Sequence, residues 1–272
     1  MAIADSAATA KFEIGRVATR TFTVVRANFF AFFVLGLIAT LPTTIYAIAA
    51  TANIVPGAAA AIAKGGSALA WLIGVGVSAF VGFLFAFILQ AAVTYGTIGY
   101  LSNQPVVLGR ALMIGLREIL PLFAIALLEG LGVGLGFVLL IVPGIMLYVM
   151  WSVVVPIRIA EHTGIFAAFG RSRELTRGHR WPVFGTLVVF YLGAGIAQTT
   201  TRPVLALGVA TRMAGSVGNS LASPQFYVLG AINLLVSAII AVVSATLIAC
   251  VYYELRLVKE GVGPEQIAAV FD

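Results

Sequence analysis

The first long uncharged stretch of the chain, residues 27–63, reads ANFFAFFVLGLIATLPTTIYAIAATANIVPGAAAAIA. A helix of about 20 mostly apolar residues crosses the hydrocarbon core of a bilayer. We therefore predict a membrane span at residues 29–49 and an outer loop at residues 51–64. The basic leader before this span is longer than that of a secretory signal, so we expect the span to be retained.

The composition of the whole chain agrees with a membrane protein. Hydrophobic residues make up 61% of the 272 residues and charged residues only 10%, with a mean hydropathy of +1.08. Soluble domains carry about 25% charged residues. An open sheet edge cannot satisfy its backbone polar groups in lipid, which predicts an all-α polytopic bundle. No stretch reads as a linker, so we expect one integral membrane domain over residues 1–272.

Further apolar stretches predict five more spans, which makes six spans in three hairpins. They lie at about 69–96, 182–201 and 227–253, with two spans inside 119–157. The turn between those two falls either in the glycine tract 130–136 or at Pro143-Gly144. We favour the glycine tract, because a helix that starts after Pro143 would be short before Arg158.

Positive charges predict the orientation of these spans. Thirteen Lys and Arg residues fall on the side of both termini, and only Lys64, Arg202 and Arg212 fall on the other side. Cytoplasmic loops carry the excess of Lys and Arg. We therefore expect a multi-pass protein of a bacterial inner (cytoplasmic) membrane, with both termini cytoplasmic.

A short motif recurs before each predicted hairpin. Gly-Arg pairs occur at Gly15-Arg16, Gly109-Arg110 and Gly170-Arg171, which predicts internal repeats that begin near residues 12, 106 and 166. Each repeat would be a short amphipathic cytoplasmic-side helix followed by a hairpin. The alternative is chance pairing in a glycine-rich chain. In the third repeat an apolar stripe opposes a charged one, as in a helix lying in the headgroup plane; the stripes are Phe166, Phe169, Ser172 and Leu175 against Arg171, Glu174 and Arg177.

One segment carries a family resemblance. Residues 141–152 read IVPGIMLYVMWS, Val155-Pro156 follows, and residues 168–181 read AFGRSRELTRGHRW. This segment resembles the membrane domain of glycerophosphoryl diester phosphodiesterases and its stand-alone bacterial relatives. Phe169 and Gly170 depart from the usual Ala-Leu of that pattern, and the residues in register are Arg171, Ser172, Leu175, Thr176, Gly178 and Trp181.

The resemblance implies a membrane module rather than an activity. In the fused members of that family, hydrolysis belongs to a soluble barrel with metal-binding carboxylates and catalytic histidines. This chain has two histidines, His162 and His179, and it ends soon after its last span. We therefore expect no phosphodiesterase activity.

Candidate site residues fall into two groups. The intramembrane polar residues are Glu129, Gln90, Gln198 and Asn233. Glu129 is the only formal charge well inside a predicted span, and such a residue is a functional candidate. It would instead lie near the outer headgroups if the turn is the glycine tract. The three amides are expected to form interhelical hydrogen bonds.

The second group is a cytoplasmic block predicted to bind lipids or a partner: Arg171, Arg173, Arg177, Arg180 and Trp181. Arginines beside the headgroups attract anionic lipid by about 1 kcal/mol each. The alternative is that these arginines only set orientation. Small residues at four-residue spacing predict close helix packing; they are Gly74, Ser78 and Gly82, and Gly132 and Gly136.

No motif for catalysis, metal binding or a cofactor occurs, and Cys250 is the only cysteine. These observations favour a non-enzymatic scaffold or accessory module that binds anionic membrane lipids or another membrane protein, including a second copy of itself. The alternative is a small transporter or channel, which would place the four polar residues on one water-accessible surface. We expect no nucleic-acid partner, because the basic residues are spread along one membrane face.

Overall fold

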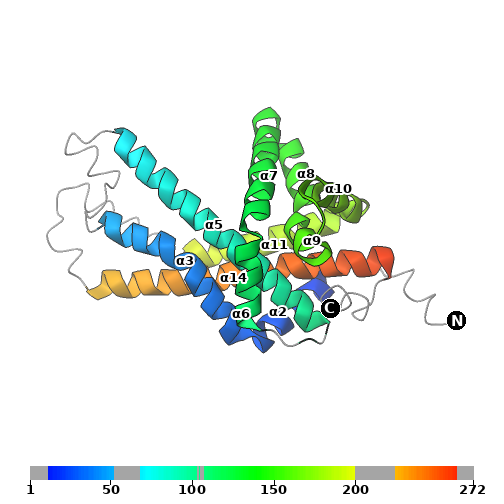
Figure 1. Ribbon diagram of the computed structural model, residues 1–272, viewed down its shortest axis with the longest axis horizontal. Helices are drawn as coiled ribbons and strands as arrows, with labels where there is room; N and C mark the ends of the chain where they lie inside the picture. The colour runs from blue at the N-terminus through cyan, green and yellow to red at the C-terminus, as the bar shows by residue number, and fades with distance from the viewer. Residues whose placement is uncertain (1–11, 52–67, 103, 105–106, 200–223, 262–272) are drawn as a thin grey trace. The chain divides into compact units, whose positions relative to one another are not determined.

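The structure is a computed structural model that describes residues 12–51, 68–102, 104, 107–199 and 224–261. Within these ranges every regular element is a helix (Figure 1). In chain order the helices are α2 (Ile14–Ala27), α3 (Phe29–Thr51), α5 (Ala68–Leu101), α6 (Leu108–Arg117), α7 (Ile119–Leu139), α8 (Ile141–Trp151), α9 (Val154–Glu161), α10 (Ile165–Thr176), α11 (Arg180–Thr199) and α14 (Pro224–Glu260).

Among the described residues, five helical segments are long and apolar enough to cross a membrane. They are Phe80–Leu101, Ile119–Leu139, Ile141–Glu161, Arg180–Thr199 and Gly230–Glu260. A sixth span results if α2 and α3, which are bent by 90° at Asn28, are counted together. The predicted all-α, multi-pass membrane protein is thus confirmed.

The order of helices follows the predicted plan of a short helix before each hairpin. The short helix α2 precedes α3 and α5, α6 precedes α7 and α8–α9, and α10 precedes α11 and α14. On α2, the buried residues Val17, Thr21 and Val24 recur at helical spacing, as in an amphipathic helix. A duplication of the sequence itself stays a prediction.

The contacts divide the chain into two compact units. The described residues of unit 1 lie within Met1–Phe32, Phe87–Phe190 and Val242–Asp272. Those of unit 2 lie within Phe33–Ala86 and Tyr191–Ala241. In unit 2, a Cβ on Gly82 would lie 2.5 Å from Cγ2 of Thr43, so α5 and α3 approach closely there. Gly74 and Ser78 belong to the same predicted spacing, and their packing lies outside what the structure describes.

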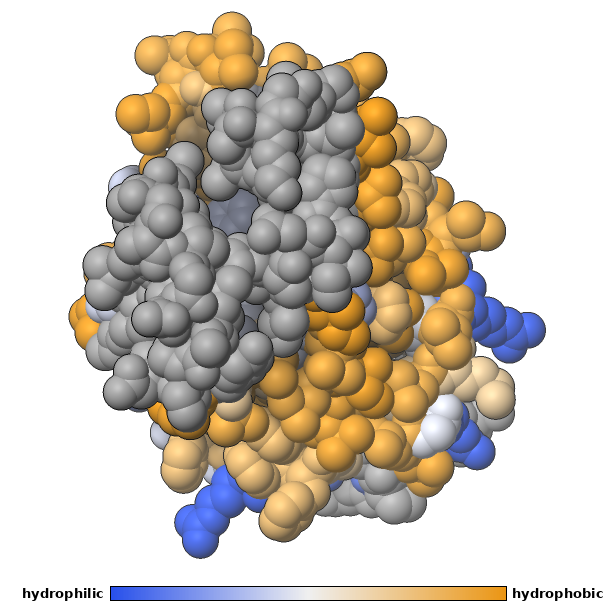
Figure 2. All heavy atoms as spheres, turned by 90° about the vertical axis from the view of Figure 1, so that its left-hand side faces the viewer, coloured by the Kyte–Doolittle hydropathy of each residue, from blue (hydrophilic) through white to orange (hydrophobic). Residues whose placement is uncertain are grey.

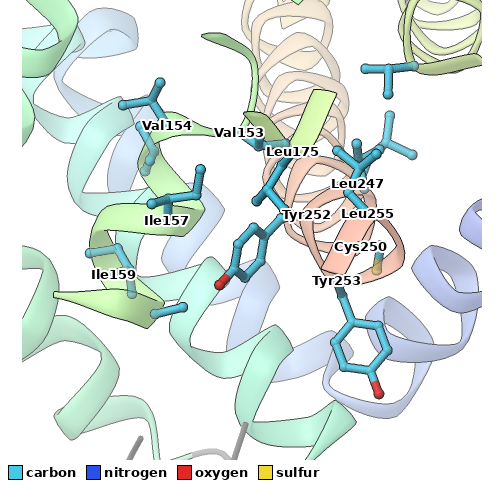
Figure 3. Packing of buried hydrophobic residues seen from close by; sticks show 14 of the residues in the cluster. Val153, Val154, Ile157, Ile159, Leu175, Leu247, Cys250, Tyr252, Tyr253 and Leu255 are labelled. Carbon is cyan, nitrogen blue, oxygen red and sulfur yellow. The ribbon is translucent and has the colours of Figure 1, made fainter. Parts of the chain in front are cut away.

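Unit 1 contains a well-packed apolar core around the end of α14. Figure 3 shows Tyr252, Leu255 and Cys250 of α14 packed near Leu175 of α10. All four are buried, and the same cluster takes in Ile157 and other residues of α9. This core fixes the end of α14 against the helices that carry the site.

The turn between the third and fourth spans was wrongly placed in the glycine tract. Helix α7 runs through that tract to Leu139, the extended residue Leu140 forms the turn, and α8 begins at Ile141. Pro143 lies in the first turn of α8, where a missing N–H costs nothing. The span is not short, because α9 continues it to Glu161.

Two glycines of the tract, Gly132 and Gly136, allow close helix packing and do not form a turn. A Cβ on Gly132 would lie 2.4 Å from Cζ3 of Trp151, and one on Gly136 would lie 2.9 Å from Cα of Gly144. Helices α7 and α8 lie side by side along this contact (Figure 1). The predicted close packing through Gly132 and Gly136 is therefore confirmed within one chain.

Gly136→Ala tests this packing. We expect the substitution to lower the free energy of unfolding by about 1–3 kcal/mol, because the new methyl group meets the backbone of α8. The matched control is Gly134→Ala, since a Cβ there meets nothing within 4 Å. Unfolding of the detergent-solubilised protein by dodecyl sulfate measures both, and equal stabilities would contradict the interpretation.

Candidate functional site

A fully buried carboxylate, Glu254 of α14, pairs with two arginines of α2. Arg20 Nη1 donates a hydrogen bond to Glu254 Oε2. Arg16 Nε lies 2.9 Å from Oε1, with a geometry that makes this contact an ion pair rather than an aligned hydrogen bond. Arg16 also reaches the exposed Glu13 at 3.4 Å. The pairs attach α2 to the end of α14.

Two consecutive tyrosines extend this contact in different directions, as Figure 3 shows. The guanidinium of Arg20 lies 5.1 Å from the ring centroid of Tyr253, a cation–π distance. The hydroxyl of Tyr252 donates to Glu161 Oε1 at 2.9 Å. The end of α14 therefore contacts α2 through one tyrosine and α9 through the other.

A second ion-pair cluster joins α9, α10 and α14. Arg171 donates to Glu161 Oε2 at 3.1 Å and to Glu260 Oε1. Arg256 Nε donates to Glu260 Oε2 at 2.9 Å. Burial acts to lower the pKa of Arg171, but its two carboxylate partners outweigh that effect and raise it. Arg171 thus stays charged and links α10 to α9 and α14.

A third ion pair holds the start of α7 to α9. Arg158 Nε donates to Glu118 Oε2 at 2.8 Å, and Arg158 Nη1 donates to the carbonyl oxygen of Thr163 at 2.5 Å. Both side chains are largely shielded from solvent. Arg158 therefore lies in the span Ile141–Glu161 with its charge neutralised.

Five other arginines are exposed and form no ion pair with any residue of the described ranges: Arg26, Arg110, Arg117, Arg173 and Arg177. All five lie on a short helix or, for Arg177, at its C-cap. The same helices expose large apolar side chains, namely Phe22 at 68%, Met113 at 69% and Phe166 at 78%. Helices with adjacent basic and apolar surface bind in the headgroup region of a bilayer.

The block predicted at residues 171–181 therefore separates into three parts. Arg171 joins helices through Glu161 and Glu260, and its predicted role in lipid or partner binding stays a prediction. Arg173 and Arg177 are exposed. Arg180 and Trp181 line a cavity of about 400 Å³ beside α8.

The buried face of α10 coincides only in part with the predicted apolar stripe. Phe166 is exposed, whereas Ala168, Ser172, Leu175 and Thr176 are buried. The reason is a polar contact with α8, because Ser172 Oγ donates to the carbonyl oxygen of Met150 at 2.7 Å. Neither this contact nor Glu254 was predicted from sequence. The signal available for Glu254 was an acidic residue at the end of an apolar run.

The intramembrane polar residues do not gather in one unit. Glu129 and Gln90 belong to unit 1, and Gln198 and Asn233 belong to unit 2. Glu129 lies at the midpoint of α7, so the expectation that it lies near the outer headgroups was wrong. The cause is the position of the turn at Leu140. Over the described part of the chain, no three His, Cys, Asp or Glu residues come close enough to hold a metal ion.

Glu254→Gln tests the buried pair. Removing this charge leaves Arg20 without its carboxylate partner and Arg16 with only the exposed Glu13, and we expect unfolding stability to fall by about 3 kcal/mol. Glu13→Gln is the control, because Glu13 pairs with the same Arg16 but is exposed, and exposed pairs contribute less than about 1 kcal/mol. Detergent-phase unfolding measures both; an equally small loss for Glu254→Gln would contradict a structural role.

His179 provides a pH-dependent test. Burial lowers its pKa below the usual 6.5, the charge of Lys259 lowers it further, and a backbone hydrogen bond at Arg177 opposes both. Below pH 6.5 the unfolded chain takes up this proton first, so stability falls as pH falls. We expect Lys259→Gln to raise the His179 pKa in an NMR titration. Lys259→Arg, which keeps the charge, should leave it unchanged, and an unchanged pKa in Lys259→Gln would exclude this contact.

Comparison with known proteins places this helical architecture in a family. Residues 81–255, more than half of the chain, match the family model described as Domain of unknown function (DUF7847). No curated protein and no solved structure matches. The resemblance of residues 141–181 to the phosphodiesterase membrane domain is tested by none of this and stays a prediction. The chain belongs to the DUF7847 family.

Proposed function

We propose that this protein is a non-enzymatic module of a bacterial inner membrane that binds anionic lipids through its three short helices. Both termini would be cytoplasmic in this proposal. The observation that carries it is the set of five exposed arginines without described ion-pair partners, Arg26, Arg110, Arg117, Arg173 and Arg177, on helices that also expose large apolar side chains.

The division between paired and unpaired arginines supports lipid binding. The acidic residues Glu118, Glu161, Glu254 and Glu260 already compensate the arginines that join helices. The remaining arginines would be compensated by lipid phosphates, at about 1 kcal/mol for each arginine near an anionic surface. Orientation by positive charge alone would not require Phe22, Met113 and Phe166 to be exposed on the same helices.

The surface of the protein agrees with this arrangement. Most of the described atoms visible in Figure 2 are hydrophobic, and a few hydrophilic side chains project from them. Such a surface is solvated by acyl chains over most of its area and by headgroups where the charged residues project.

Lipid selectivity is the first test. We expect spin-labelled phosphatidylglycerol to associate with the reconstituted protein more strongly than spin-labelled phosphatidylcholine, with a preference that falls as salt rises. In the double variant Arg173→Glu, Arg177→Glu the preference should fall roughly thirtyfold, because two arginines together contribute about 2 kcal/mol. Electron spin resonance of the immobilised lipid fraction measures it.

The matched control for this test is the double variant Arg173→Lys, Arg177→Lys, which keeps both charges and should keep the preference. An unchanged preference after charge reversal would reject the proposal. Co-purification of a stoichiometric membrane protein, lost on the same charge reversal, would show instead that these arginines bind an acidic partner.

A small transporter or channel is the second candidate, favoured by Glu129 at the midpoint of α7. Its carboxylate forms no hydrogen bond or ion pair with a residue of the described ranges. An ionisable residue at that depth is a default functional hypothesis. A proton or ion flux across proteoliposomes that disappears in Glu129→Gln would favour transport over lipid binding alone.

A further inference from the structure

An apolar groove runs between α8 and α11 within unit 1. One face of α8 lines it with Val142, Ile145, Met146 and Val149, at helical spacing, and α11 contributes Arg180, Trp181 and Phe184. Its volume of about 400 Å³ lies in the range of small-ligand sites. The groove is open at its side, because Val142 is 74% and Met146 50% exposed.

The lining selects a hydrocarbon chain as the occupant. Six of the seven residues are apolar or aromatic, and Arg180 is the one charged member. A polar solute would leave its hydrogen-bonding groups unpaired against this lining, which is costly. Trp181, 82% exposed, stands edge-on to Phe184 with the ring centroids 6.0 Å apart. Such an aromatic residue suits the boundary between acyl chains and headgroups.

Arg180 gives the groove its chemical polarity. It is the one charged residue among those that line the groove, and it forms no ion pair with any residue of the described ranges. A guanidinium matches the oxygens of a phosphate group. Arg180 is also the first residue of α11, where the helix dipole favours an anion.

From a single guanidinium, that of Arg180, in the lining of an otherwise apolar groove, we infer a discrete phospholipid site. One anionic phospholipid binds with an acyl chain along Val142, Met146 and Phe184 and with its phosphate against Arg180. This inference rests on the proposed lipid-binding function and deepens it, because it distinguishes one fixed lipid from the lipids attracted to the short helices.

Native mass spectrometry of the full chain in mild detergent tests the site. Titration with phosphatidylglycerol should give one tightly bound lipid per protein, and phosphatidylcholine should bind more weakly. Arg180→Gln should weaken the phosphatidylglycerol adduct roughly tenfold or more, whereas Arg180→Lys should retain part of the preference. Met146→Trp, at a half-exposed position, should block the groove and abolish the adduct.

Two variants control for charge and bulk. Lys259→Gln removes an exposed positive charge outside the groove lining and should leave the single adduct intact. Val189→Trp adds bulk at an exposed position of α11 that does not line the groove and should also leave it intact. Equal losses in Arg180→Gln and Lys259→Gln, or an adduct with no preference for the anionic lipid, would overturn the site.

The two proposals fail separately. If the spin-label preference persists and depends on Arg173 and Arg177, but no single adduct forms, the groove site is wrong and the proposed function stands. If one lipid stays bound through Arg180 while charge reversal at Arg173 and Arg177 changes nothing, the proposed function of the short helices is wrong.

Discussion

The buried carboxylate of Glu254 is the charge on which the arrangement of unit 1 depends. A carboxylate without solvent contact is stable only beside compensating charge, so Arg16 and Arg20 must remain against α14. Helix α2 is thereby fixed to α14, and its buried residues Val17 and Val24 lie next to the paired arginines around the helix. Helices α2 and α3 are bent by 90° at Asn28.

The same constraint explains which arginines remain available to a ligand. Glu161 and Glu260 hold Arg171, and Glu118 holds Arg158, because charges near or inside the spans cannot rely on water. The exposed arginines of the short helices form no such ion pair with any of the described residues. The division between structural and exposed arginines therefore follows from where the few acidic residues lie along the chain.

The helical class and the approximate spans could be predicted because apolar run length is a local property of the sequence. The turn at Leu140 could not be predicted, because a glycine tract is compatible both with a turn and with close helix packing. Here Gly132 and Gly136 pack closely beside Trp151 and Gly144. The block at residues 171–181 was correctly singled out as basic. Its separation into Arg171, Arg177 and Arg180 depends on tertiary contacts with Glu161 and α8, which no local pattern encodes.

An open groove between α8 and α11 is not in itself unusual in a membrane protein. Lipid tails are as apolar as leucine, so no hydrophobic force closes a gap between two helices. Helix α8 already uses Gly144 to pack on α7 and the carbonyl of Met150 to hold α10, and in the proposed site the face that lines the groove contacts an acyl chain. A guanidinium in that groove needs a polar partner, because hydrocarbon cannot accept its hydrogen bonds. Arg180 therefore restricts the choice of ligand more than the apolar lining does. Only a ligand that joins an anionic head to a hydrocarbon chain satisfies both the guanidinium and the lining.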